Sequence, residues 1–354
     1  MEKPRAILKI LHTINKRNLR ESAADFRSVV LQPLTAPNLP RHLQIEIITR
    51  CNLECVMCPR TVALENASTA AQKKVWQRQM SIENFRHIIE EIPKIQTLSL
   101  HGIGEPLMHP HLFEMIEIAA SVKIDVRFTT NATLLNSSKS EDLLKTGISR
   151  VIFSLDGATM ETYEKIRIGA KFDKVIENIR RFLLLRKEFG QKNPIADINM
   201  VVTRQNYFEA EKMIELGAEL GVDSIILSPM QPPEKELEEN CCDSEMWHAL
   251  AERAKQKAKT INIKLYLRGG IYESKKTFAE KQTHKCLHPW TTAVVTMDGE
   301  VMPCCNIHSK TFSMGNIFTR NFAELWNDTC YKNFRSELRQ KGNVPLPCRW
   351  CPDF

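Results

Sequence analysis

The chain has 354 residues, of which 43% are hydrophobic and 26% are charged, with a formal net charge of +7. The basic residues are dispersed rather than gathered in one stripe, so we expect no nucleic-acid partner. No apolar run approaches the roughly 20 residues of a membrane-spanning helix and no secretory signal is recognisable, so we expect no membrane span and a cytoplasmic protein. In such a protein, the 11 cysteines are more often metal ligands or redox groups than disulfides.

Residues 1–40 predict a helical extension followed by an irregular segment. Apolar residues from Ile7 to Ile14 fall near helical spacing, with lysines and arginines around them. Such a stripe suits a helix packed on the body of the protein or one lying on a membrane surface, and the packed helix is the commoner case. Pro37 and Pro40 mark the end of this extension.

Residues 41–230 alternate short β-branched runs with longer amphipathic segments. We expect strands at 43–49, 97–101, 126–131, 150–156, 197–203 and 224–229, and helices at 81–93, 110–122, 139–146, 172–189 and 206–220. Successive β/α units indicate a parallel sheet with right-handed crossovers. Six units are too few for a closed barrel of eight, which leaves a partial (β/α)6 TIM-like barrel or a doubly wound sheet. Both α/β folds place the site at the carboxyl ends of the strands.

Residues 231–285 interrupt the alternation and form a predicted connector, with a helix at 244–259 and one further strand at 261–267. Residues 286–354 are rich in cysteine. The stretch "TTAVVTMDGEVMPC" alternates apolar residues around Asp298–Gly299, which predicts a β-hairpin with a tight turn. We therefore expect a small C-terminal α+β module made of a hairpin plus a helix.

The loop after the first predicted strand, "RCNLECVMCPR", spaces Cys51, Cys55 and Cys58 as CxxxCxxC. Three thiolates from one loop can bind three irons of a cubane 4Fe–4S cluster and leave its fourth iron open for a non-protein ligand. A structural zinc site would need a fourth protein ligand, and no cysteine or histidine follows at the usual spacing. Zinc is therefore the second interpretation of this loop.

The loop resembles the signature of the radical SAM superfamily, whose cluster binds S-adenosylmethionine at the open iron. The segment "HGIGEP", at the end of the second predicted strand, is similar to that family's Gly-x-Glu-Pro segment. The resemblance implies that Gly102, Gly104, Glu105 and Pro106 contact the cofactor. The glycines would permit close approach of the backbone, and Glu105 would face the methionine ammonium.

Three further strand ends carry polar residues at positions where the family binds its cofactor. The resemblance implies that Asn131 follows the third strand near the ligand and that Ser154 and Asp156 lie near the adenosyl ribose. It also implies that Arg167 meets the methionine carboxylate. For Asn131 and Asp156, a turn or helix cap explains the residue equally well. Asn199 on the fifth strand is a weaker candidate.

The C-terminal module offers four cysteines in two pairs, Cys286 with Cys304 and Cys348 with Cys351. A closed four-thiolate site holds zinc or an iron–sulfur cluster, and spacing alone does not separate them. The module resembles the SPASM/twitch appendage of radical SAM enzymes. Since the later cysteines of the full SPASM pattern are missing, the resemblance implies one auxiliary cluster and two 4Fe–4S clusters in total. Cys305 is a candidate hydrogen-atom donor to a substrate radical, or a packed turn residue.

This resemblance implies reductive cleavage of S-adenosylmethionine to a 5′-deoxyadenosyl radical, which abstracts hydrogen from a substrate C–H bond. The electron would come from a low-potential flavodoxin- or ferredoxin-like donor. One outcome is oxidation of a sugar or aminocyclitol alcohol, with the auxiliary cluster as electron acceptor. Alternatives are crosslinking, epimerisation or oxidation of a ribosomal peptide, and redox-neutral epimerisation or decarboxylation of a small molecule. A zinc or iron–sulfur binding protein without catalysis is the non-enzymatic alternative.

Overall fold

The computed structural model describes residues 28, 30–231, 235–268, 286–305, 312–339, 345 and 348. Most of the predicted N-terminal helix and the predicted cluster ligand Cys351 lie outside these residues. Within the described ranges, no helix combines the length and apolar character that a bilayer crossing requires.

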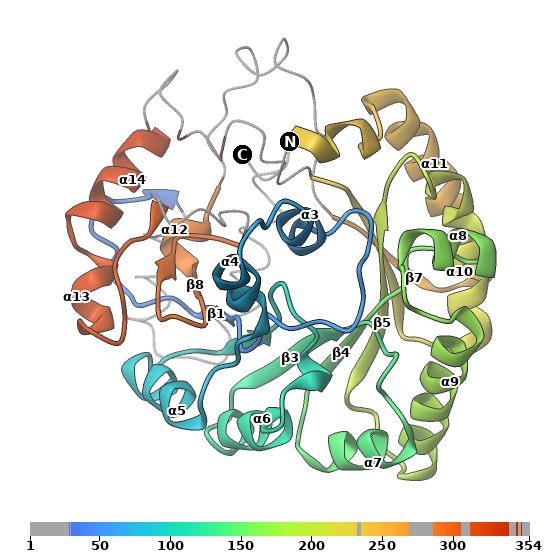
Figure 1. Cartoon of the computed structure of the whole chain (residues 1–354), viewed down its shortest axis with the longest axis horizontal. Coiled ribbons are helices and arrows are strands. Elements are labelled where there is room, and N and C mark those ends of the chain that lie inside the picture. The colour runs from blue at the N-terminus through green and yellow to red at the C-terminus, as the bar shows by residue number, and fades with distance from the viewer. Residues whose placement is uncertain are drawn as a thin grey trace.

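Among the described residues, the fold is built on one nine-stranded sheet in the order β7-β6-β5-β4-β3-β2-β1-β8-β9 (Figure 1). Neighbouring strands pair in parallel, except β8 and β9, which are antiparallel. All six strands predicted for the body are present, and the connector adds β7. The strands are β1 His42–Ile45, β2 Thr97–Leu100, β3 Asp125–Thr130, β4 Arg150–Ser154, β5 Ile195–Val202, β6 Ser224–Pro229, β7 Lys264–Leu267, β8 Thr292–Val295 and β9 Val301–Met302.

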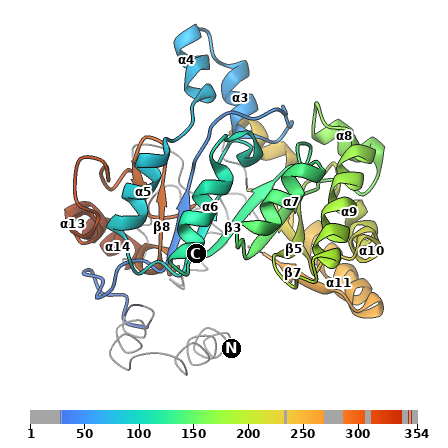
Figure 2. The same ribbon diagram turned by 90° about the horizontal axis from the view of Figure 1, so that it is seen from below.

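Helices cover the outer side of the curved sheet, with α5, α6, α7, α9 and α11 around its circumference (Figure 1). In Figure 2, α3 and α4 project at one end of the molecule. The helices of the described residues are α3 Pro59–Glu65, α4 Ala70–Lys74, α5 Ile82–Glu91, α6 Leu112–Ser121, α7 Ser137–Lys145, α8 Met160–Ile166, α9 Phe172–Glu188, α10 Ala210–Leu220, α11 Ser244–Ile261, α12 His288–Thr291, α13 Phe322–Trp326 and α14 Thr329–Arg339. Short 3-10 turns lie at η1 Val75–Gln77, η2 Pro106–Met108, η3 Tyr207–Glu209 and η4 Lys235–Asn240.

Local capping fixes where several of these helices begin and end. Ser81, Asn136 and Asp243 each accept a hydrogen bond from a backbone N–H in the first turn of the helix that follows. The helix α10 ends at Gly221, whose φ of 81° is in the left-handed region that glycine adopts without strain.

The two faces of the central strands differ in chemistry. In β3, the outward residues Val126 and Phe128 are fully buried under the helices, whereas the alternate residues Arg127 and Thr129 are only partly buried. Because successive side chains point to opposite faces of a strand, the inner face is polar and partly accessible. The result is a partial, open barrel, as expected from six β/α units.

The C-terminal hairpin is joined to the barrel sheet. Strand β8 pairs in parallel with β1, with Leu43 opposite Ala293 and Ile45 opposite Val295. The predicted turn is present, with Gly299 at a φ of 84°. The sequence predicts the hairpin but not its pairing with β1, because the pattern of a β-hairpin does not indicate which strand of another sheet it will join.

Candidate functional site

The cysteine loop, residues 46–58, runs from the end of β1 to the start of α3. Its backbone is fixed to the end of α8, since the N–H groups of Glu54 and Val56 donate to the carbonyl oxygens of Ile168 and Ile166, both at 3.0 Å. The loop therefore lies at the carboxyl end of the strands, where the alternating β/α pattern predicted the site.

Arg60 holds this loop from within. It is 4% exposed, and its Nε donates to the carbonyl oxygen of Thr49 at 3.1 Å while its terminal nitrogen donates to that of Leu53 at 3.4 Å. This role of Arg60 is not predictable from the sequence, because nothing about an arginine beside a motif indicates that its side chain will turn inward and bind backbone carbonyls.

Cys51, Cys55 and Cys58 are all half-buried on this loop. Burial raises the pKa of Cys51, and it raises the pKa of Cys55 to about 12, with smaller contributions of the same sign from neighbouring thiols. Such thiols ionise only when a cationic partner compensates the buried charge. Within the described part of the chain, no three or more Cys, His, Asp or Glu side chains converge as they would on a single metal ion. Three thiols on one loop fit an iron–sulfur cluster, in which each sulfur binds a different iron, better than a closed zinc site, which needs a fourth protein ligand.

The "HGIGEP" segment packs against the chain just before Cys51. A Cβ on Gly104 would lie 2.3 Å from the carbonyl oxygen of Ile48, and a Cβ on Gly102 would lie 2.7 Å from the side chain of Glu46. The N–H of Glu105 donates to the carbonyl oxygen of Arg50 at 2.9 Å. The glycines therefore support the cysteine loop by close packing, and their contact with a cofactor stays a prediction.

Glu105 ties the end of β2 to the end of β3. Its Oε1 accepts hydrogen bonds from Thr130 Oγ1 at 2.7 Å and from Leu107 N at 3.0 Å, and its Oε2 accepts one from Asn131 N at 2.7 Å. The carboxylate is 3% exposed, and burial raises its pKa in spite of these hydrogen bonds. Pro106, which begins η2, is buried beside it. Both carboxylate oxygens of Glu105 thus accept hydrogen bonds from the chain. An ammonium group that contacts Glu105, as predicted, would have to donate to one of these same oxygens.

Asn131 connects the cysteine loop to β3. Its Nδ2 donates to Asn52 Oδ1 at 3.0 Å and lies 4.0 Å from Cys51 Sγ. Its Oδ1 accepts from Thr133 Oγ1 at 2.7 Å, and Asn52 Nδ2 donates to that same hydroxyl at 2.8 Å. Because hydrogen bonds to cluster sulfurs help set reduction potentials, Asn131 is placed to influence a cluster on Cys51. The roles of Asn52 and Thr133 were missed.

Asp156 and Arg167 form a buried ion pair beside the loop. Arg167 Nε lies 2.7 Å from Asp156 Oδ2, and the carboxylate is completely buried. Burial lowers the pKa of Arg167, but the charge of Asp156 outweighs it and the net direction is upward. The charge of Arg167 also lowers the pKa of Cys55 against the effect of burial. Arg167 is therefore a buried residue whose charge acts on the thiol of Cys55, and its contact with a methionine carboxylate stays a prediction.

Ser154 and Asn199 lie opposite each other in the register of β4 and β5. Ser228 Oγ on β6 donates to Asn199 Oδ1 at 3.1 Å. These three half-buried polar side chains continue the inner face of the barrel next to Asp156. Their contact with an adenosyl group stays a prediction.

The auxiliary-site cysteines are only partly described. Cys304 and Cys348 are buried, Cys286 and Cys305 are half-buried, and Cys351 lies outside the described residues. The pairing of Cys286 with Cys304 and of Cys348 with Cys351 at one cluster stays a prediction, as does hydrogen-atom donation by Cys305.

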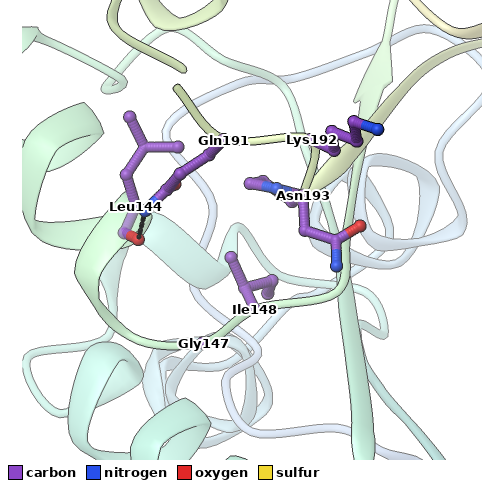
Figure 3. A pocket seen from close by; sticks show the side chains of 7 residues that line it. Leu144, Gly147, Ile148, Gln191, Lys192 and Asn193 are labelled. Atoms are coloured by element: carbon purple, nitrogen blue, oxygen red, sulfur yellow. Dashed lines mark hydrogen bonds between the residues drawn. The ribbon is translucent and has the colours of Figure 1, made fainter. Parts of the chain in front are cut away.

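A cavity of about 350 Å³ lies away from this site (Figure 3). It is lined by Leu144, Gly147, Ile148, Gln191, Lys192, Asn193 and Pro194. These residues precede β4 and β5, so the cavity is at the amino ends of the strands. It holds no pair of acid–base groups and is not the site indicated by the cysteine loop.

Two family models match the chain. The model of the radical SAM superfamily matches residues 45–217, and that of an iron–sulfur cluster-binding domain, SPASM, matches residues 286–352. The chain belongs to the radical SAM superfamily. It accordingly uses S-adenosylmethionine and a 4Fe–4S cluster, and its SPASM domain binds additional iron–sulfur clusters. The non-enzymatic alternative is thereby set aside.

The relatives of this radical SAM enzyme act on different substrates. The chain is 29% identical to the AdoMet-dependent heme synthase of Methanosarcina barkeri, over 87% of this chain and 88% of the relative. It is 24% identical to the PqqA peptide cyclase of Gluconobacter oxydans, over 90% and 84%. The crystal structure of Streptococcus suis SuiB bound to precursor peptide SuiA has a TM-score of 0.67 at 18% identity, covering 95% of this chain and 75% of that chain, and shows the same fold.

Proposed function

We propose that this radical SAM enzyme modifies a ribosomally made peptide by abstracting hydrogen from one of its C–H bonds. The observation that carries the proposal is the similarity to a peptide cyclase along 90% of the chain. Among the alternatives drawn from the sequence, peptide modification therefore replaces oxidation of a sugar or aminocyclitol alcohol as the leading one. None of the relatives reported above is named for alcohol oxidation.

The rim of the barrel supports a large substrate. Val56, Met160, Ile168 and Phe208 follow the carboxyl ends of β1, β4 and β5, and each is between 36% and 57% exposed. Apolar side chains gathered around the mouth of a site can bind an extended chain. A peptide could rest on this rim while one residue enters the barrel.

Cys51, Cys55 and Cys58 would hold the 4Fe–4S cluster, and that cluster with bound S-adenosylmethionine would supply a 5′-deoxyadenosyl radical. The chain's own residues position and shield that chemistry. Arg60 shapes the loop, Asn131 approaches the sulfur of Cys51, and the Asp156–Arg167 pair fixes the wall beside Cys55. Their burial limits the water that reaches a reactive radical.

A second candidate is the modification of an organic cofactor or its precursor. The observation that favours it is the 29% identity with a heme synthase over nearly the whole of both chains. The two candidates require different substrates but the same cluster and the same nucleotide.

The test is anaerobic turnover with substrates of both classes. Reconstituted, dithionite-reduced enzyme would be incubated with S-adenosylmethionine and either any short peptide that a neighbouring gene encodes or an iron tetrapyrrole. We expect 5′-deoxyadenosine to form together with a peptide whose mass or stereochemistry has changed. A changed tetrapyrrole beside unchanged peptides would overturn the peptide proposal and support the second candidate. A Cys51→Ala, Cys55→Ala, Cys58→Ala variant is the matched control and should yield neither product.

A further inference from the structure

Glu209 is a buried carboxylate that receives hydrogen bonds from the start of α8. It lies at the end of η3, in the loop after β5, and is 2% exposed. Its Oε2 accepts from Ala158 N at 2.6 Å, and its Oε1 accepts from Thr159 Oγ1 at 2.6 Å and from Thr162 Oγ1 at 2.8 Å. Among the described residues, no basic side chain forms an ion pair with Glu209. A carboxylate that is withdrawn from water without a cationic partner is costly to bury.

Capping of α8 does not require this carboxylate. Thr159 already occupies the N-cap of α8, and its Oγ1 accepts from Thr162 N at 3.4 Å. Glu209 adds a connection between the loops that follow β4 and β5, because its three donors all lie at the start of α8. Asn206, in the same loop after β5, makes a second connection, since its Nδ2 donates to the carbonyl oxygen of Asp156 at 2.9 Å. The loop after β5 therefore holds the chain that enters α8 at two points.

The other end of α8 holds the cysteine loop. The carbonyl oxygens of Ile166 and Ile168 accept from Val56 N and Glu54 N, both at 3.0 Å, so these two hydrogen bonds flank Cys55. The helix has seven residues, which makes it roughly 10 Å long. Its backbone is internally hydrogen-bonded, so a shift at its start also moves its end. The position of Cys55 thus depends on where α8 is held.

Arg167 lies at the same end of α8. It is the C-cap residue of the helix, and its guanidinium pairs with the buried carboxylate of Asp156. Asp156 is in turn held by β5, because Val201 N donates to its Oδ1 at 2.8 Å. A displacement of α8 would therefore disturb the Asp156–Arg167 pair at the same time as it moves Cys55.

We propose that Glu209 is a positioning residue for the cleavage of S-adenosylmethionine, which acts by holding α8 so that Cys55 and Arg167 keep their places. The hydrogen bonds of Glu209 all go to the start of the helix, so its effect is transmitted through α8. Groups that orient metal ligands commonly change metal affinity or activity by about 10- to 100-fold when they are removed. The proposal does not depend on the identity of the substrate, because it concerns the step that precedes substrate chemistry.

The first test compares Glu209→Gln with the unaltered holoenzyme after anaerobic reconstitution. Glutamine has the same shape, but its amide nitrogen cannot accept a hydrogen bond, so at least one of the three donors loses its acceptor. We expect full iron content but a different change in the electron paramagnetic resonance spectrum of the reduced enzyme when S-adenosylmethionine is added. We also expect 5′-deoxyadenosine to form about tenfold more slowly.

Glu219→Gln is the matched control, because it removes a charge from the exposed ion pair between Glu219 on α10 and Arg180 on α9. It should have the spectrum and the rate of the unaltered enzyme. An unchanged spectrum and rate in Glu209→Gln would overturn the proposal. A lower free energy of unfolding with an unchanged spectrum in the folded enzyme would do the same, because it would give Glu209 a structural role only.

Thr162 provides a second test, which leaves the carboxylate in place. Thr162→Val removes one hydroxyl donor to Glu209 with little change of shape, whereas Thr162→Ser retains that donor. We expect Thr162→Val to show the altered spectrum and a rate about threefold lower, the scale of one hydrogen bond, and Thr162→Ser to behave as the unaltered enzyme does.

The double variant Glu209→Gln, Thr162→Val shows whether the two side chains act through one contact. Its rate should be no more than about twofold below that of Glu209→Gln, because both substitutions break the same contact. Losses that multiply would contradict the proposal. Should Glu209→Gln fail to fold, Thr162→Val decides alone, and a normal spectrum and rate in that variant would refute the role of Glu209. All of these measurements use S-adenosylmethionine without a peptide, so their outcome and that of the peptide proposal are independent.

Discussion

The buried arginines of this protein have different structural roles, and the role of each depends on the groups that its guanidinium contacts. Arg60 binds backbone carbonyls, and Arg167 neutralises Asp156. Arg335 is fully buried between the rings of Trp326 and Tyr331, 4.8 and 4.9 Å from their centroids.

Replacing Arg60 by lysine should disorganise the cysteine loop. A lysine keeps the charge but cannot direct two fixed donors to the carbonyls of Thr49 and Leu53. We expect a loss of about 1.5–3 kcal/mol in the free energy of unfolding, the range for hydrogen bonds to charged groups, together with reduced iron bound at the loop. Chemical denaturation and iron analysis measure both. Arg86→Lys, at an exposed ion pair with Glu114, is the control, and equal iron in the two variants would refute the role of Arg60.

Replacing Arg167 by glutamine should destabilise the protein in a pH-dependent way. Burial already raises the pKa of Asp156 above its value in the unfolded chain. The folded state therefore binds more protons than the unfolded state, and the protein loses stability as the pH rises from the unfolded-state pKa of Asp156 to its folded-state pKa. Without Arg167 the pKa of Asp156 rises further and the loss grows. We expect about 3–5 kcal/mol at pH 7, the range for a broken buried pair, and a smaller loss near pH 4.

Denaturation of the Arg167→Gln variant at the two pH values measures this difference. Arg180→Gln should change stability little at either pH. A loss for Arg167→Gln that was equal at both pH values would show that Asp156 does not carry the effect.

At the scale of elements, the helices and strands that produce a periodic pattern of apolar residues could be predicted from the sequence. The strands of the body and the helices α5, α6, α7, α9, α10 and α11 were expected because their apolar residues repeat at strand or helical spacing. Contacts between elements have no such signal. The Asn52–Thr133 hydrogen bond joins residues 81 positions apart, and the pairing of β8 with β1 places Leu43 opposite Ala293. These could be found only in the folded chain.

The "HGIGEP" segment packs closely against the chain before Cys51, and this packing should not tolerate a side chain at Gly104. In Gly104→Ala the new Cβ would collide with backbone oxygens of Ile48 and Arg50, which cannot move without displacing the cysteine loop. We expect loss of iron at the loop and of 5′-deoxyadenosine formation. The control is Gly190→Ala, where a Cβ meets nothing within 4 Å and the positive φ costs about 1–2 kcal/mol. Normal iron content in Gly104→Ala would contradict the packing argument.

At the scale of the whole molecule, the C-terminal module completes the core of the barrel. Strand β8 covers the edge of β1, and the N–H groups of Arg41 and Glu46 donate to Thr291 and Val295 carbonyl oxygens at 3.1 and 3.0 Å. The irregular segment before β1 is held by the same module, since Trp290 Nε1 donates to the carbonyl oxygen of Pro33 and Trp326 Nε1 to that of Asn38. An auxiliary domain inferred from cysteines is thus also a structural part of the fold.

A chain that ends at residue 285 should consequently fail to form a soluble barrel. Loss of the C-terminal module would remove β8 and so uncover the edge of β1, together with the buried side chains of Leu43 and Ile45, which are 2% and 0% exposed. An uncovered strand edge promotes aggregation. The soluble fraction and size-exclusion profile of the truncated chain measure this. Cys304→Ala with Cys348→Ala is the matched control, because it removes predicted auxiliary ligands while keeping β8. We expect that variant to remain soluble and to retain iron at Cys51, Cys55 and Cys58, whereas a monomeric, iron-loaded chain of residues 1–285 would show that the barrel stands without the module.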